Sequence, residues 1–138
     1  MIIPSQHASR VARAAGSDNT PAAVNWLTLN SGGTRFSTQQ ITSISSSITV
    51  ELTVSAGTSP GTRLWFKKDT TVPSYTTSSP SAYGFTQIAA YPTSITVNNN
   101  EYLSFGMASA VARGSSGTIA VTNTSDSNTV LDTFTLQW

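Results

Sequence analysis

Residues that could carry acid–base or nucleophilic chemistry are few and scattered in this chain of 138 residues. A Ser-His-acid arrangement needs a histidine that is held in place, and the only histidine, His7, lies in a leading segment that we expect to be extended or mobile. The six acidic residues are at least six positions apart, and nothing in the sequence pairs them in one cleft. The chain has no cysteine and no phosphate-cradling glycine motif. We therefore expect a protein that is not an enzyme and that needs no cofactor.

Calcium is the one metal ion that the residue pattern brings into consideration. Asp126, Asn128 and Asp132 lie in or beside one polar turn, and hard cations take oxygen ligands from such turns. Their spacing matches no calcium-loop signature, and Asp and Asn in a turn commonly bond to their own backbone instead. The sequence therefore favours a structural turn over a metal site.

Asp132 stands out because alternation places its carboxylate on the same face as Val130, Phe134 and Leu136. An unpaired charge on a buried face is unfavourable. The sequence therefore predicts one of three arrangements: a position at the sheet rim, a hydrogen bond to a neighbouring loop, or a bulge near Leu131.

The segment of residues 63–68 has the composition of a partner-binding strand. Alternation places Arg63, Trp65 and Lys67 on one face and Leu64 and Phe66 on the other. Three of the seven basic residues fall within these six positions. A tryptophan between cations is suited to anchor a protein interface, and it could also stack on a sugar or a base. Ordinary packing of Trp65 under a covered sheet face is the alternative, and the sequence leaves these possibilities open.

Residues 1–22 differ from the rest of the chain, and we expect them to form an N-terminal arm. They hold the only histidine and two of the seven basic residues. The two basic residues are Arg10 and Arg13, and Val11 is the one sizeable apolar residue of residues 5–15. The first residues turn polar at once and lack the apolar region of a signal peptide. We therefore expect synthesis in the cytoplasm without export by that route.

Residues 23–138 read as strands and turns, because apolar residues alternate with threonine or other polar residues in segments such as 48–54 and 133–138. Further strands are expected at residues 24–29, 34–41, 63–68, 85–91, 94–97, 101–107, 118–123 and 129–138. Residues 94–97 and 101–107 are expected to form a hairpin across Asn98, Asn99 and Asn100, and residues 69–82 a long surface loop. The expected fold class is an all-β antiparallel β-sandwich, with a jelly roll as the alternative topology.

The charge balance restricts the class of partner. Charged residues make up 9% of the chain and the formal net charge is +1, which favours association over dispersal and argues against a duplex nucleic-acid binder. No stretch approaches the ~20 apolar residues that span a bilayer. We therefore expect neither a nucleic acid nor a membrane as partner.

Two segments of the last third of the chain resemble a known kind of domain. Ser-Ile-Thr-Val-Asn-Asn-Asn-Glu-Tyr-Leu-Ser-Phe at residues 94–105 is similar to the strand–turn–strand hairpin of immunoglobulin-like repeats in tailed-bacteriophage virion proteins. Residues 117–123 followed by residues 129–136 look like the closing strand pair of those repeats. The resemblance implies an immunoglobulin-like sandwich and a role as a phage structural protein.

Among phage structural proteins, a single domain with an arm suits a head decoration (cement) protein. The resemblance then implies that the partner is the major capsid protein, that the chain forms a homo-oligomer with a trimer favoured, and that it lies on the capsid exterior of the virion. On this reading we expect the contacts to come from Arg10, Val11 and Arg13 in the arm and from Arg63, Trp65 and Lys67 on the body. A tail, neck or fibre module is the alternative within this class. A carbohydrate-binding module that uses Trp65, Tyr75 or Tyr83 is the alternative outside it.

Overall fold

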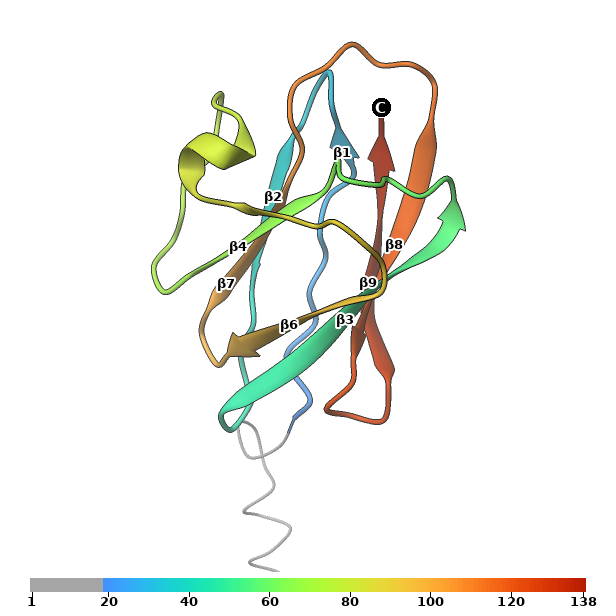
Figure 1. The fold of residues 1–138 in the computed structure, drawn as a ribbon. Coiled ribbons are helices and arrows are strands. Elements are labelled where there is room, and N and C mark those ends of the chain that lie inside the picture. Colours follow the sequence, from blue (N-terminus) through green and yellow to red (C-terminus); the bar gives the residue numbers. More distant parts are fainter. Residues whose placement is uncertain (1–18) are drawn as a thin grey trace, which may run out of the picture.

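The computed structural model describes residues 19–138, which fold as two β-sheets packed face to face (Figure 1). The five-stranded sheet contains, in spatial order, β1 (Leu29–Asn30), β9 (Thr129–Gln137), β8 (Ser116–Asn123), β3 (Ser47–Gly57) and β6 (Thr93–Asn98). The four-stranded sheet contains β2 (Phe36–Gln40), β7 (Tyr102–Gly106), β4 (Trp65–Asp69) and β5 (Thr86–Gln87). A short 3₁₀ helix, η1 (Pro80–Tyr83), precedes β5. The expected all-β sandwich is confirmed.

The strand order contains pairings of both expected topologies. β2 pairs with β7, β3 with β6 and β4 with β5, as when one long hairpin is rolled into two sheets. This is the pairing of a jelly roll, with β9 added between β1 and β8. The pairs β2–β7, β3–β8 and β8–β9, divided between the two sheets, also match the B–E, C–F and F–G neighbours of an immunoglobulin sandwich. All neighbours are antiparallel except β1 and β9, which run parallel.

The hairpin expected at residues 94–107 is wrong, because β6 and β7 lie in different sheets. The turn between them is a corner, in which the Glu101 N–H donates to the Asn98 carbonyl at 3.0 Å and the Asn98 N–H donates to Glu101 Oε1 at 2.7 Å. Asn100 has a φ of 73°, a left-handed conformation that asparagine tolerates. Alternation reveals which side chains are buried but not which strand is the neighbour, so the sequence did not distinguish a hairpin from a corner.

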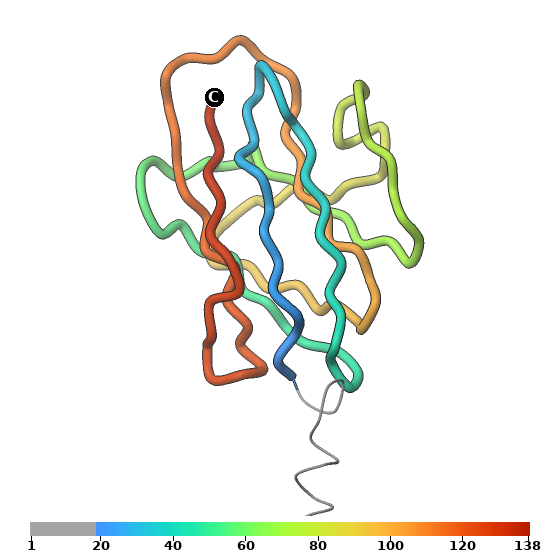
Figure 2. The backbone as a smooth tube through the Cα atoms, turned by 180° about the vertical axis from the view of Figure 1, so that it is seen from behind, coloured from blue at the N-terminus to red at the C-terminus, as the bar shows by residue number. Residues whose placement is uncertain are grey.

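Trp26 fills the centre of the core between the sheets. Its indole Nε1 donates to the Leu103 carbonyl at 3.0 Å, and its ring meets Phe105 edge to face at 5.2 Å. The strand expected at residues 24–29 forms only at Leu29, where β1 begins; residues 19–28 run between β9 and β2, as Figure 2 shows in blue. The Leu27 N–H donates to Ser37 Oγ at 2.8 Å on β2. Side-chain bonds therefore take the place of a strand ladder along this segment.

Two of the arrangements predicted for Asp132 are confirmed together. Val121 pairs with Asp132 and Thr122 with Val130, so Leu131 is the extra residue of a bulge. Asp132 Oδ2 accepts a hydrogen bond from the Trp26 N–H at 2.7 Å. Because of the bulge Val130 is 54% exposed, and the expectation that it shares the buried face of Asp132 is wrong.

The loop between β4 and β5 covers one end of the outer face of the four-stranded sheet. Its Tyr75 and Tyr83 rings lie 4.9 Å apart, and Tyr75 also packs on Phe85 at 4.8 Å. Phe36 joins this aromatic cluster from β2. Gly106 has no side chain and so leaves room for the Phe36 ring, since a Cβ at this position would lie 2.8 Å from that ring. The loop predicted from its lack of periodicity is thus packed on the sheet.

Candidate functional site

Trp138 is held in place at the end of the sandwich that lies opposite Asn19 (Figure 1). Its N–H donates to the Ser115 carbonyl at 2.9 Å, and its carbonyl accepts from the Ser115 N–H at 2.8 Å. The residue is 6% exposed. The guanidinium carbon of Arg63 lies 5.2 Å from the centroid of the indole, a cation–π contact. Burial fixes the Trp138 side chain, and the cation–π contact orients the exposed Arg63 side chain over it.

A pocket of about 190 Å³ opens beside this pair. Arg63, Trp65, Met107 and Trp138 supply its larger side chains, and Gln87 and Ala108 are among the smaller ones. Trp65 reaches it from β4, where it pairs with Gly106 and is half-buried. The structure thus brings together Arg63 and Trp65, two of the residues that the sequence predicted to contact a partner.

The loop at residues 108–114 borders this pocket and is exposed at every position. Its sequence is Ala-Ser-Ala-Val-Ala-Arg-Gly, and Val111 is 82% exposed. A second hollow of about 330 Å³ lies between the loop and Trp138, and its lining includes Arg63, Val111 and Arg113. An exposed apolar loop beside a concave surface is typical of an interaction site.

We define the Trp138 surface by the side chains that line these two hollows. They are Arg63, Trp65, Met107, Val111, Arg113 and Trp138. Tryptophan, arginine and methionine are enriched in protein interfaces, and fixed aromatic and arginine anchors dominate binding energy there. The arrangement can bind a partner, and it offers no paired acid and base for catalysis.

Lys67 does not belong to the Trp138 surface. Its Nζ lies 2.5 Å from Asp69 Oδ1 and 3.2 Å from the Tyr75 hydroxyl, and Tyr75 donates to Asp69 Oδ2. The bond to Asp69 raises the pKa of Lys67, and burial raises the pKa of Tyr75. This network attaches the covering loop to β4. Lys67–Asp69 is the only ion pair formed between side chains of residues 19–138.

The predicted arm residues Arg10, Val11 and Arg13 lie outside the described residues. The described chain begins at Asn19, whose carbonyl accepts a hydrogen bond from Asn123 Nδ2 at 2.7 Å. Thr20 Oγ1 donates to Asp126 Oδ2 at 3.0 Å. Residues 19 and 20 are therefore attached to the turn between β8 and β9, at the end of the sandwich opposite Trp138.

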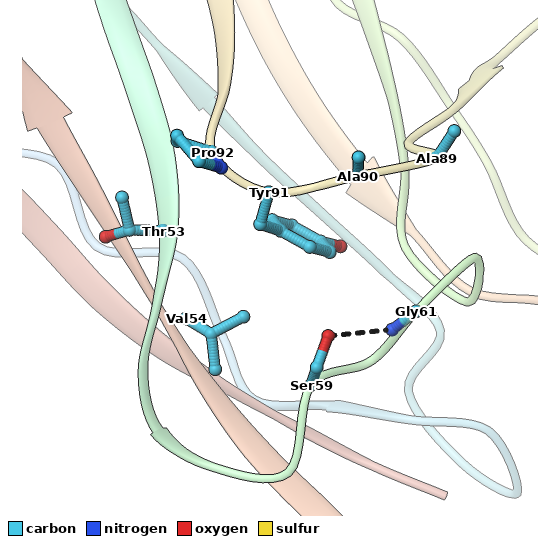
Figure 3. A pocket seen from close by; sticks show the side chains of 8 residues that line it. All are labelled: Thr53, Val54, Ser59, Gly61, Ala89, Ala90, Tyr91 and Pro92. Carbon is cyan, nitrogen blue, oxygen red and sulfur yellow. Dashed lines mark hydrogen bonds between the residues drawn. The ribbon is translucent and has the colours of Figure 1, made fainter.

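A separate hollow of about 420 Å³ lies beside β3 (Figure 3). The Tyr91 ring lies across it, opposite Ser59 and Gly61. The Tyr91 hydroxyl is buried and has no hydrogen-bond partner within residues 19–138, and burial raises the pKa of Tyr91 to about 12. Neither an acidic nor a basic residue lines this hollow, so it lacks the cationic character of the Trp138 surface.

The calcium alternative gains no support from the positions of the acids. Asp126 accepts a hydrogen bond from Thr20 and Asp132 accepts one from Trp26, so each carboxylate is bonded to a different residue. In the described part of the chain, no three His, Cys, Asp or Glu residues form a group that could hold a metal ion.

Sequence reasoning missed Met107, Val111, Arg113 and Trp138 as parts of the site. A signal for the loop was present, because residues 108–113 are mostly apolar yet neither alternate nor contain turn residues. Such a run has no reason to be apolar on a solvated surface. No signal placed it beside Arg63, since that proximity depends on the strand order.

No helix within residues 19–138 is long and apolar enough to cross a membrane. Comparisons with models of protein families, with curated proteins and with solved structures found no match to this chain.

Proposed function

We propose that this protein is a non-enzymatic structural subunit that docks on a larger protein assembly through the Trp138 surface. The observation that carries the proposal is a fixed tryptophan stacked by an arginine beside a fully exposed apolar loop. Burial of Val111 by a partner removes apolar area from water, while Trp65 and Trp138 offer rigid anchors. The sandwich is a rigid scaffold that presents the Trp138 surface to the partner.

The outer face of the five-stranded sheet supports a role in association. Thr118 and Thr135 Oγ1 lie 3.3 Å apart, and Thr49 and Thr96 Oγ1 lie 3.4 Å apart. Threonine ladders of this kind keep the face polar with few charges. A second copy can therefore approach without strong charge repulsion, as a homo-oligomer requires. Repetition of the Trp138 surface around a symmetry axis, in a trimer for example, then multiplies modest affinities.

The specific role that we propose is head decoration of a tailed bacteriophage, with the major capsid protein as partner and the capsid exterior as location. This choice rests on the resemblance of the closing strand pair. β8 and β9 are neighbours in one sheet, whereas residues 94–105 form a corner between sheets and give the resemblance no further support. A tail, neck or fibre module is the alternative within the same class.

A carbohydrate-binding module is less well supported. Tyr75 and Tyr83 pack on each other at 4.9 Å within the aromatic cluster, and the Tyr75 hydroxyl is bonded to Asp69. Of the three aromatic residues considered for sugar stacking, Trp65 alone lines a pocket of the Trp138 surface. Protein docking uses Arg63, Trp65 and Val111 together.

The number of copies per particle tests the proposed role. Particles purified from the producing cells are separated on a quantitative gel, with the major capsid protein as internal standard. We expect hundreds of copies per particle for head decoration. Tens of copies or fewer would assign the protein to the tail, neck or fibre instead. Its absence from every particle would contradict the proposal.

Removal of residues 1–18 tests the arm. This deletion retains Asn19 and Thr20, which are bonded to the body, so the fold is expected to survive. We expect the shortened protein to occupy fewer sites on particles that lack their own copy. A full-length variant with Arg10→Gln and Arg13→Gln separates the charge of the arm from its length. Full occupancy by the shortened protein would contradict a role for the arm.

A further inference from the structure

Arg63 and Arg113 line one hollow and have no anionic partner within residues 19–138. The acids of the described chain are mostly engaged elsewhere: Asp69 pairs with Lys67, Asp126 accepts from Thr20, and Asp132 accepts from Trp26. Glu101 accepts from the Asn98 N–H at the corner. The two guanidinium groups therefore present positive charge that no acidic side chain of residues 19–138 neutralises.

The stacking of Arg63 prepares its guanidinium group for an anion. Its guanidinium carbon lies 5.2 Å from the centroid of the Trp138 ring, and none of its N–H donors bonds to an acidic side chain of the described chain. The planar edge of a guanidinium group matches a carboxylate, which accepts two parallel hydrogen bonds. The cation–π contact already orients the exposed Arg63 side chain, so less conformational freedom is lost when a ligand binds.

From this arrangement we propose that the hollow between Arg63 and Arg113 binds a carboxylate side chain from an acidic segment of the partner protein. The inference rests on the proposed docking function and specifies the chemistry of the partner. The hollow of about 330 Å³ accommodates a Glu or Asp side chain. Val111 and Trp138 contact the apolar atoms that flank the carboxylate.

A nucleic acid is a less suitable partner for the same cations. Its binding depends on many phosphate contacts, whereas this hollow is lined by two cations and the whole chain has a formal net charge of +1. Exposed apolar side chains such as Val111 suit a polypeptide better than a sugar–phosphate backbone.

The test uses the full-length protein and a fluorescein-labelled hexaglutamate peptide, followed by fluorescence anisotropy at low salt. We expect saturable binding that weakens as the NaCl concentration rises, and no binding of hexaglutamine. Arg63→Gln combined with Arg113→Gln should weaken binding at least tenfold. Lys68→Gln is the matched control, since it removes the same charge from a residue whose Nζ bonds to the Thr96 carbonyl and which lines neither hollow.

Arg113→Gln alone keeps the test valid if the double variant unfolds, because the Arg113 side chain forms no hydrogen bond or ion pair with residues 19–138. Equal affinity of the wild type and of Arg113→Gln for hexaglutamate would overturn the inference. Tighter binding of a labelled oligothymidylate than of hexaglutamate would overturn it in favour of a nucleic acid.

Particle occupancy separates failure of this inference from failure of the proposed function. If particles carry hundreds of copies and the double variant occupies them fully, the docking function stands and the carboxylate site is rejected. If the double variant loses hexaglutamate binding while no particle contains the protein, the carboxylate site stands and the phage role is rejected.

Discussion

The carboxylate of Asp132 accepts a hydrogen bond from the backbone N–H of Trp26 at 2.7 Å, across 106 residues of sequence. Trp26 lies outside any strand, so its N–H has no ladder partner. The bulge at Leu131 aims the carboxylate at it. One side chain thus joins the segment at residues 19–28 to the last strand and satisfies a partly buried donor.

Replacement of Asp132 by alanine is expected to lower the free energy of unfolding by about 1–3 kcal/mol, because a partly buried N–H loses its acceptor. Asp132→Asn retains an acceptor oxygen of the same shape and is expected to lose less. Urea denaturation of both variants measures the difference. An alanine variant as stable as the wild type would show that the bond contributes nothing.

Gly106→Ala is expected to destabilise the fold by about 1–3 kcal/mol through overpacking. The new Cβ would lie 2.8 Å from the Phe36 ring and 3.2 Å from the Phe85 ring, so the aromatic cluster must shift. Gly33→Ala is the matched control, since its Cβ meets its nearest neighbour at 3.7 Å. Thermal unfolding compares the two, and equal melting temperatures would contradict the packing described here.

Tyr91→Phe is expected to leave stability at pH 7 unchanged or slightly higher, because the variant buries no unpaired hydroxyl. The pKa of Tyr91 is about 12 in the folded protein and about 10 when unfolded. The unfolded chain therefore loses this proton first, and wild-type stability falls as the pH rises from about 10 towards 12. Urea midpoints at several pH values test this: the wild type should lose more stability than the variant above pH 10, and parallel losses would argue against a buried phenol.

The sequence assigned Lys67 to the interface, whereas the structure shows it bonded to Asp69 and Tyr75. The Lys67→Gln variant tests whether Lys67 also takes part in docking. The Lys67 and Asp69 side chains are 28% and 18% exposed, so loss of the pair should cost less than about 1 kcal/mol. Particle occupancy should not change. A folded Lys67→Gln protein that fails to dock would return Lys67 to the interface.

The sequence was most informative where alternation is regular and partners are local. Residues 48–54 predicted a strand with one buried face, and β3 has Ile48, Val50 and Leu52 each at most 1% exposed. The charge at Asp132 on an otherwise apolar face predicted both the bulge and the bond to a neighbour. In these cases the local pattern alone shows which side chains must be buried and which charge must find a hydrogen-bond partner.

Long-range pairing was beyond such reasoning. The Asn98–Glu101 turn is equally compatible with a hairpin and a corner, and the choice depends on β6 having β3 as its neighbour. The Trp138 surface likewise combines Arg63, the loop at residues 108–114 and the last residue of the chain. Their proximity follows from the rolled topology, which no local pattern encodes.

Hydrogen exchange of the docked protein tests the central claim most directly. In residues 108–114 of the structure, Ala110 alone donates a backbone hydrogen bond, to the Ser31 carbonyl, so this loop should exchange rapidly in the free protein. When the protein is bound to its particle, we predict at least tenfold slower exchange across residues 108–114. Unchanged exchange there, with protection confined to other surfaces of the bound protein, would contradict docking through the Trp138 surface.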